Sequence, residues 1–147
     1  MTDVVALAKK LYRAINQQTT PDTVDQLDLI YLIIDAIEEL YIISGRQEQY
    51  SEDKIELEQE SETIVCTFAD TLSTDERRWV VLDAEINFYR WVQNSVDDMF
   101  SYSTDAMTVS HGDKPYKNIG DTIADRKEKL NRIWYSMIRF NQLGVAG

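Results

Sequence analysis

The chain has 147 residues, 44% hydrophobic and 28% charged, which predicts one globular domain over residues 1–147 with a core of its own. It has a single cysteine, Cys66, and no run near the ~18 apolar residues of a membrane span, so we expect synthesis in a reducing cytoplasm and no membrane association. The net charge of −11 lies in an acidic lobe, residues 19–62, where thirteen acidic residues face only two basic ones, Arg46 and Lys54, and would repel a nucleic-acid backbone.

Residues 3–17 and 21–43 are predicted to form the first two helices. In the first, apolar residues recur at three- and four-residue steps behind Thr2, which we expect to cap the helix. The second begins with Pro21, and its apolar residues cover more than one face, which predicts a central helix with several neighbours. Gly45 is expected to end it.

The segment 46–72 has no single interpretation. Apolar and polar residues alternate near Ile55 and Leu57, and a short apolar run follows. A strand pair, a loosely ordered acidic connection and another helix all fit this pattern.

Two further helices are predicted in the second half of the chain. Ser73 and Glu76 have the spacing of a capping box, so a helix should begin there. Residues 119–142 carry an apolar stripe that ends at Gly144. The expected fold is therefore mainly α: a four-helix-type bundle with an extended loop or β-ribbon arm between the last two helices.

That arm, residues 101–118, contains Gly112 and Pro115 in a helix-poor stretch. Connections longer than ~12–15 residues are uncommon in compact domains unless they are functional or disordered. Apolar and polar residues alternate around "HGDKP", which favours an extended arm that pairs with another chain, with a surface loop as the alternative. The arm residues that we expect to make contacts are Met107, Val109, His111, Lys114 and Tyr116.

Aromatic residues are concentrated on the two C-terminal helices. Helical spacing assigns most of them to the core, but they cannot all face one way. Some aromatic surface is therefore expected to be exposed for a partner, and the candidates are Trp79, Trp91 and Trp134.

The acidic helices also suggest a metal site. A helical di-iron site needs a Glu-x-x-His pair from each of two helices, which a chain with one histidine cannot supply. A magnesium-dependent all-helical nucleotide hydrolase needs only carboxylates and remains the enzymatic alternative, although Asp35 and Glu38 have no convincing partner pair. We predict no enzyme activity and no catalytic, cofactor-binding or metal-ligating residue; His111 is interpreted as a turn residue and Cys66 as a core residue.

The stretch "FADTLSTDERRWVVLDAEINFYRWV", the irregular segment after it and "YKNIGDTIADRKEKLNRIWYSMIRF" together resemble the small neck proteins of tailed bacteriophages, the head–tail connector (adaptor or head-completion) proteins. Phe68, Leu72, Ser73 and Glu76 match the lead-in to the capped helix, and residues 119–142 match the closing helix. The resemblance covers residues 64–142. The acidic segment 46–63 has no counterpart in that pattern.

The resemblance implies a non-enzymatic virion protein of the neck region that forms a ring, typically of twelve copies, beneath the portal protein. Such a ring extends the channel for DNA, which passes without specific binding, and presents a surface to neighbouring neck and tail proteins. The acidic lobe could line this channel, and the candidate residues are Glu48, Glu52, Asp53, Glu56 and Glu58. A small acidic interaction protein that mimics DNA, or an inhibitor, is the alternative.

Overall fold

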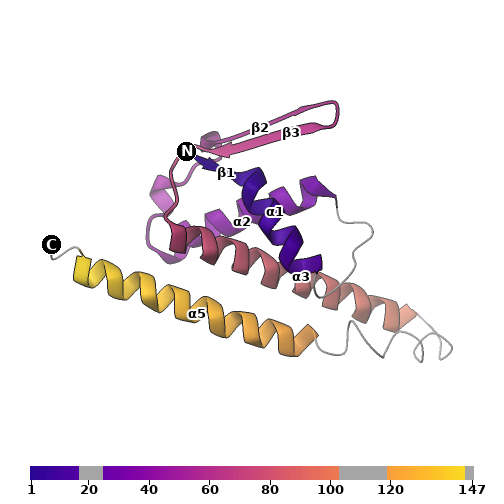
Figure 1. Ribbon diagram of the computed structural model, residues 1–147. Coiled ribbons are helices and arrows are strands. Elements are labelled where there is room, and N and C mark those ends of the chain that lie inside the picture. The colour runs from indigo at the N-terminus through magenta and orange to yellow at the C-terminus, as the bar shows by residue number, and fades with distance from the viewer. Residues whose placement is uncertain (17–24, 103–118, 145–147) are drawn as a thin grey trace.

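The computed structural model describes residues 1–16, 25–102 and 119–144 (Figure 1). Four α-helices occur in these ranges, together with a small three-stranded sheet, so the prediction of a mainly helical fold is confirmed. The elements are β1 (Thr2–Asp3), α1 (Val4–Asn16), α2 (Gln26–Ile43), β2 (Ile55–Glu60), β3 (Thr63–Phe68), α3 (Thr74–Tyr102) and α5 (Ile119–Gly144), with short 3₁₀ turns at Gln47–Gln49 and Glu52–Lys54.

The first helix begins one residue later than expected and has a different cap. The backbone N–H groups of Val5 and Ala6 donate to Oδ1 of Asp3, at 3.0 and 3.3 Å. The prediction that Thr2 caps this helix is therefore wrong, because Asp3 accepts from the first free N–H groups and the Thr2 side chain is used elsewhere. Its hydroxyl instead donates to the carbonyl oxygen of Asp70 at 2.7 Å and accepts from the N–H of Leu72 at 3.0 Å.

The second helix packs against α1, α3 and the first 3₁₀ turn, so it has several neighbours, but the helix at the centre of the bundle is α3, which contacts α1, α2 and α5. The predicted start at Thr20 and Pro21 lies outside the described residues. Within them, α2 begins at Gln26. Gly45 adopts a positive φ of 73°, its N–H donates to Ile42, and the N–H of Arg46 donates to Tyr41. This pair of bonds is a Schellman motif, so the predicted stop is confirmed. The buried residues of α2 are Leu29, Ile30, Ile33, Ala36, Ile37, Leu40 and Tyr41.

The ambiguous segment contains a β-hairpin, so the strand-pair alternative is the correct one. Strands β2 and β3 pair antiparallel, Ser61 and Glu62 connect them, and β1 pairs with the far end of β3 to give the order β1-β3-β2. Cross-strand partners alternate regularly: Leu57 lies opposite Cys66, and Glu58 lies opposite Val65. In Figure 1 the hairpin projects from the helices, and only its base, near Phe68, enters the core.

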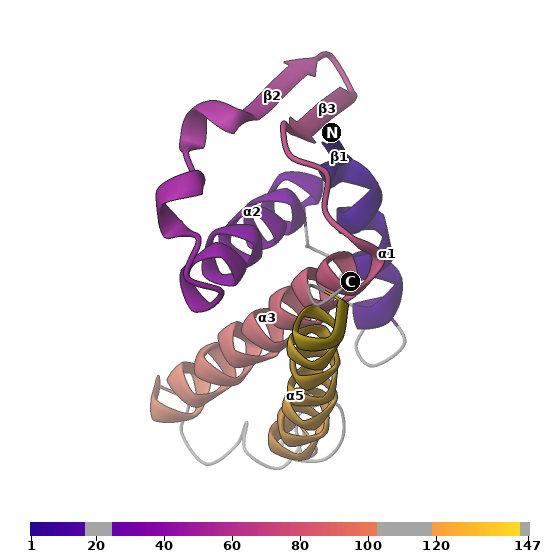
Figure 2. The same cartoon turned by 90° about the vertical axis from the view of Figure 1, so that its left-hand side faces the viewer.

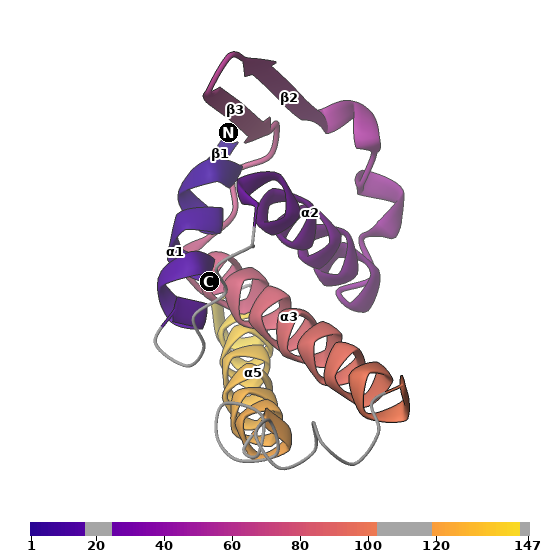
Figure 3. The ribbon, with the colours of Figure 1, turned by 90° about the vertical axis from the view of Figure 1, so that its right-hand side faces the viewer.

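The two C-terminal helices are longer than the first two. The capping box of α3 is present: the N–H of Ser73 donates to Glu76, and the N–H of Glu76 donates back to Ser73 Oγ. This helix contacts α1, α2 and α5. The sheet lies at one end of the molecule and α5 at the other in all three views (Figures 1, 2 and 3). No helix in the described part of the chain is long and apolar enough to cross a membrane.

Candidate interaction surface

An acidic surface follows the connection from α2 to β3. All five residues proposed from the sequence as channel-lining candidates are exposed: Glu48 in the first 3₁₀ turn, Glu52 and Asp53 in the second, and Glu56 and Glu58 on β2. These carboxylates lie on consecutive elements, so the acidic character predicted from composition occupies a defined part of the fold.

The hairpin has two chemically different faces. Alternation along β2 places Ile55 and Leu57 on the inner face, where both are partly buried against the core. The opposite face carries Glu56, Glu58 and Glu60, with Val65 beside Glu58 on the neighbouring strand. Because Val65 is 51% exposed, this outer acidic face also presents an apolar side chain to solvent.

A polar network attaches the acidic connection to the helices. The Tyr41 hydroxyl donates to Oδ2 of Asp70 at 2.9 Å, and Lys54 Nζ donates to the same carboxylate at 3.0 Å. The Lys54 hydrogen bond, followed by that from Tyr41, lowers the pKa of Asp70. One carboxylate thus joins α2, the second 3₁₀ turn and the loop after β3, which fixes the base of the hairpin.

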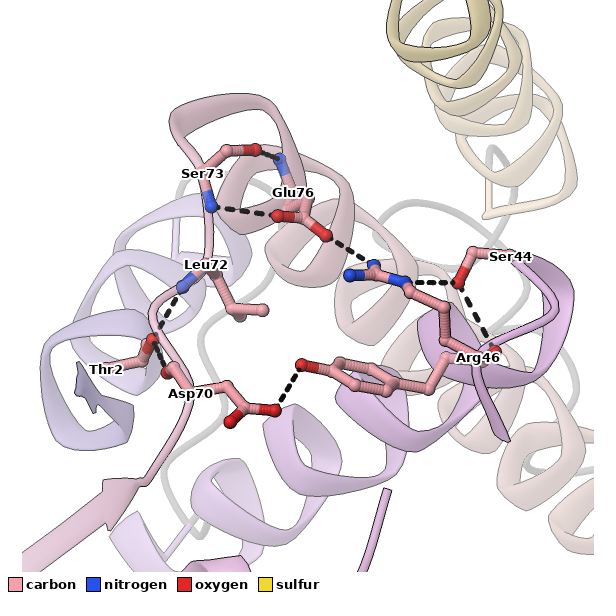
Figure 4. A network of polar contacts seen from close by, with 8 residues as sticks. Thr2, Ser44, Arg46, Asp70, Leu72, Ser73 and Glu76 are labelled. Carbon is pink, nitrogen blue, oxygen red and sulfur yellow. Dashed lines mark hydrogen bonds and ion pairs between the residues drawn. The ribbon is translucent and has the colours of Figure 1, made fainter. Parts of the chain in front are cut away.

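A second ion pair completes the network (Figure 4). The guanidinium of Arg46 donates to Oε2 of Glu76 and to Ser44 Oγ, and it lies 4.6 Å from the centre of the Tyr41 ring. Burial would raise the pKa of Glu76, but the Ser73 N–H and Arg46 outweigh burial and lower it. Glu76 therefore has two roles: it caps α3 and it binds the residue that follows the C-terminus of α2.

The three tryptophans do not form one surface. Trp79 is only 3% exposed, so its prediction as part of an exposed aromatic surface is wrong; position 79 faces the core between α3 and its neighbours. Trp91 is 60% exposed and lies 5.9 Å from the Phe88 ring, measured between centroids. Trp134 is partly buried against the core. Within the described residues, Trp91 is the candidate that presents most aromatic surface.

A pocket of about 420 Å³ opens among α1, α3 and α5. Its floor is apolar, and its rim carries Lys10 from α1 with Arg77 and Arg78 from α3, all three exposed. The only acidic lining residue, Glu85, is bound to Arg126. The pocket is therefore positively charged in a protein whose net charge is strongly negative. The other lining residues are Ala14, Thr74, Val81, Leu82 and Ile133.

Two carboxyl groups are buried on α3. Glu85 is 3% exposed and accepts from Arg126 Nε of α5 at 3.1 Å. Asp83 is 5% exposed and lies beside Glu39 of α2. Burial, then the hydrogen bond and charge of Glu39, raises the pKa of Asp83 to about 8. The raised pKa favours the protonated form of Asp83, which reduces the repulsion between the two carboxyl groups.

The arm residues Met107, Val109, His111, Lys114 and Tyr116 lie outside the described residues, so their predicted contacts stay a prediction. Cys66 is buried, and burial followed by the charge of Asp3 raises the pKa of its thiol to about 11. In the described ranges, no group of three or more His, Cys, Asp or Glu residues is placed to hold a metal ion.

Sequence reasoning missed the basic pocket and the Glu85–Arg126 pair. The basic pairs in "AKKLYR" and "DERRWV" are visible in the sequence, but each looks like the solvated side of an amphipathic helix. Their convergence depends on how α1 crosses α3, which a linear pattern does not specify.

Comparison with known proteins found no match: no protein-family model, no curated protein and no solved structure is similar to this chain.

Proposed function

We propose that this chain is a non-enzymatic structural protein of a phage virion, a head–tail connector subunit that forms a ring at the portal protein and extends the DNA channel toward the tail. The helices would form the bundle-type body of the subunit. Residues 101–118 would be the arm that attaches it to its neighbours, and the finished ring would lie in the virion neck.

The acidic connection is the observation that carries this proposal. Glu48, Glu52, Asp53, Glu56 and Glu58 are exposed on consecutive elements whose base is fixed by Asp70 and Glu76. Repeated around a ring, such a surface would repel the phosphates of passing DNA, so the nucleic acid would cross without adhering. The exposed Trp91 adds apolar surface suited to subunit or portal contacts.

Co-expression with the portal protein of the same phage tests the proposal. We expect the two proteins to co-purify as one ring-shaped particle, and we expect residues 48–56 on its inner surface. Failure to bind portal would contradict the function. A ring with these residues on its outer surface would contradict the channel role alone.

A DNA mimic is the second candidate, because Glu56, Glu58 and Glu60 form a regular row of carboxylates along β2. It predicts tight binding to a nucleic-acid-binding enzyme that duplex DNA displaces. Portal binding without such competition would favour the connector.

A further inference from the structure

The basic pocket among α1, α3 and α5 has no acidic partner for its three rim residues within the described part of the chain. No salt bridge involves Lys10, Arg77 or Arg78 in the described residues, and the guanidinium of Arg77 donates to the hydroxyl of Thr74. The floor below these cations is formed by apolar side chains, including Val81, Leu82 and Ile133. A matching ligand would therefore combine carboxylates with an apolar group.

The outer face of the β-hairpin has this combination. Glu58 and Glu60 lie two residues apart on β2, both exposed, and the half-exposed Val65 lies directly across from Glu58. The base of the same hairpin packs in the core at Cys66 and Phe68, which anchors the strands that carry the outer face. The two surfaces of the same chain are therefore complementary: their charges are opposite, and each also has an apolar part.

We propose that the outer hairpin face of one copy docks in the basic pocket of a second copy, with Glu58 and Glu60 pairing with Lys10, Arg77 and Arg78 and Val65 resting on the apolar floor. This inference rests on the proposed function and supplies its subunit contact. Glu58 then faces a neighbouring subunit, which leaves the channel to the other acidic candidates.

The arrangement of the two surfaces favours a head-to-tail contact. The hairpin lies at the end of the molecule opposite α5, whereas Ile133 of α5 lines the pocket (Figures 1 and 2). Each copy therefore offers one surface and accepts the other, and such heterologous contacts close into rings when the rotation between copies allows it. Because the pairs are between exposed charges, the association should weaken as salt is added.

Charge reversal with mixing tests the contact. Sedimentation velocity on the full chain should show reversible association at low salt. Glu58→Lys/Glu60→Lys and Arg77→Glu/Arg78→Glu should each weaken it by at least about tenfold. An equal mixture of the two variants should regain it, because the reversed hairpin of one matches the reversed pocket of the other and the unreversed pair also remains.

The control is Glu48→Lys/Glu52→Lys, which changes the net charge equally on an exposed surface away from the hairpin's outer face. It should associate like the wild type. Circular dichroism checks that each variant folds. If a reversed variant fails to fold, Glu58→Gln/Glu60→Gln replaces the hairpin reversal and Arg77→Gln/Arg78→Gln replaces the pocket reversal. Each neutral variant should weaken the association less than the reversal does.

The inference would be overturned by a wild-type chain that stays monomeric at every concentration and salt, by association that ignores the reversals, or by a mixture that regains nothing. Rings that still form on the portal protein with both reversals present would also overturn the inferred contact, but they would support the connector function. A mixture that forms only closed dimers would support the contact between the two surfaces and contradict ring formation through it. A single-stranded oligonucleotide that binds the monomer through Arg77 and Arg78 would assign the pocket to nucleic acid instead.

Discussion

Asp83 is the residue whose chemistry departs most from its place in the sequence. It lies on the third turn of a capped helix, yet it is 5% exposed beside Glu39. A buried carboxyl next to a second carboxyl favours its neutral form. Its raised pKa therefore makes the stability of the fold depend on pH.

The sign of that dependence follows from proton binding. Between the ordinary aspartate pKa of 3.8 and the raised pKa of about 8, the folded state holds the Asp83 proton and the unfolded state does not. The free energy of unfolding contributed by this group is thus fully present below pH 3.8 and is lost as the pH rises to about 8.

We expect Asp83→Asn to stabilise the protein at pH 8 by on the order of 1–3 kcal/mol, with little gain at pH 5, because the amide keeps hydrogen-bonding capacity without a charge to bury. Urea unfolding at both pH values measures the difference. Asp53→Asn removes an exposed carboxylate and should change stability little at either pH. A gain for Asp83→Asn that is equal at both pH values would contradict the assigned cause.

At the scale of single elements, one buried ion pair joins α5 to α3, in addition to the apolar side chains that α5 contributes to the core. Arg126 and Glu85 have side chains only 17% and 4% exposed, so neither charge is well solvated once its partner is gone. The pair also closes one side of the basic pocket.

Arg126→Met should destabilise the fold by about 3–5 kcal/mol, because it leaves Glu85 buried without a counter-charge. The double variant Glu85→Leu/Arg126→Met should recover most of this loss and could exceed the wild type. Thermal and denaturant unfolding of both variants and of Glu85→Leu give the coupling energy. Arg132→Met, which removes an exposed pair with Glu128, is the matched control, with a loss of less than about 1 kcal/mol.

The hairpin turn contains the one non-glycine residue with positive φ in the described ranges, Ser61 at 55°. Side chains other than glycine are disfavoured in this region because Cβ approaches the following carbonyl. Ser61→Gly should therefore raise the free energy of unfolding of the hairpin by about 0.5–1 kcal/mol. Amide hydrogen exchange in β2 and β3 measures it, and Ser51→Gly, at the 3₁₀ turn, should not slow that exchange.

At the scale of the whole molecule, charge is separated. The acidic connection and hairpin lie at the sheet end, whereas the basic pocket lies among α1, α3 and α5. A molecule with opposite surfaces of opposite charge is suited to repeated head-to-tail association. The arm, residues 101–118, is the further element that the sequence assigns to assembly, and Ser101 and Tyr102 belong to α3.

Deletion of residues 104–116 should leave a folded monomer and abolish ring formation. The physical reason is that an extended segment would contribute backbone pairing to a neighbour and little to the core of its own subunit. Light scattering after co-expression with portal protein measures assembly, and circular dichroism measures folding. A glycine- and serine-rich replacement of equal length controls for connection length. A deletion variant that assembles normally would remove the arm from the assembly mechanism.

The sequence by itself determined the helical class, the capping box at Ser73 and Glu76, the stop at Gly45 and the acidity of residues 19–62. Each of these depends on neighbours within a few positions or on composition alone, so periodicity and local hydrogen-bonding chemistry suffice. The segment 46–72 remained open because short alternating runs fit strand and helix alike.

Only the tertiary structure decided what lies next to what. It selected the hairpin, because Phe68 and Cys66 are buried when β3 pairs with β1 and β2. It places Trp79 in the core, and it places Lys10 and Arg77, more than sixty residues apart in sequence, at the same pocket. Side chains distant in the chain meet through the crossing of packed helices, and the crossing is set by many contacts at once rather than by any short motif.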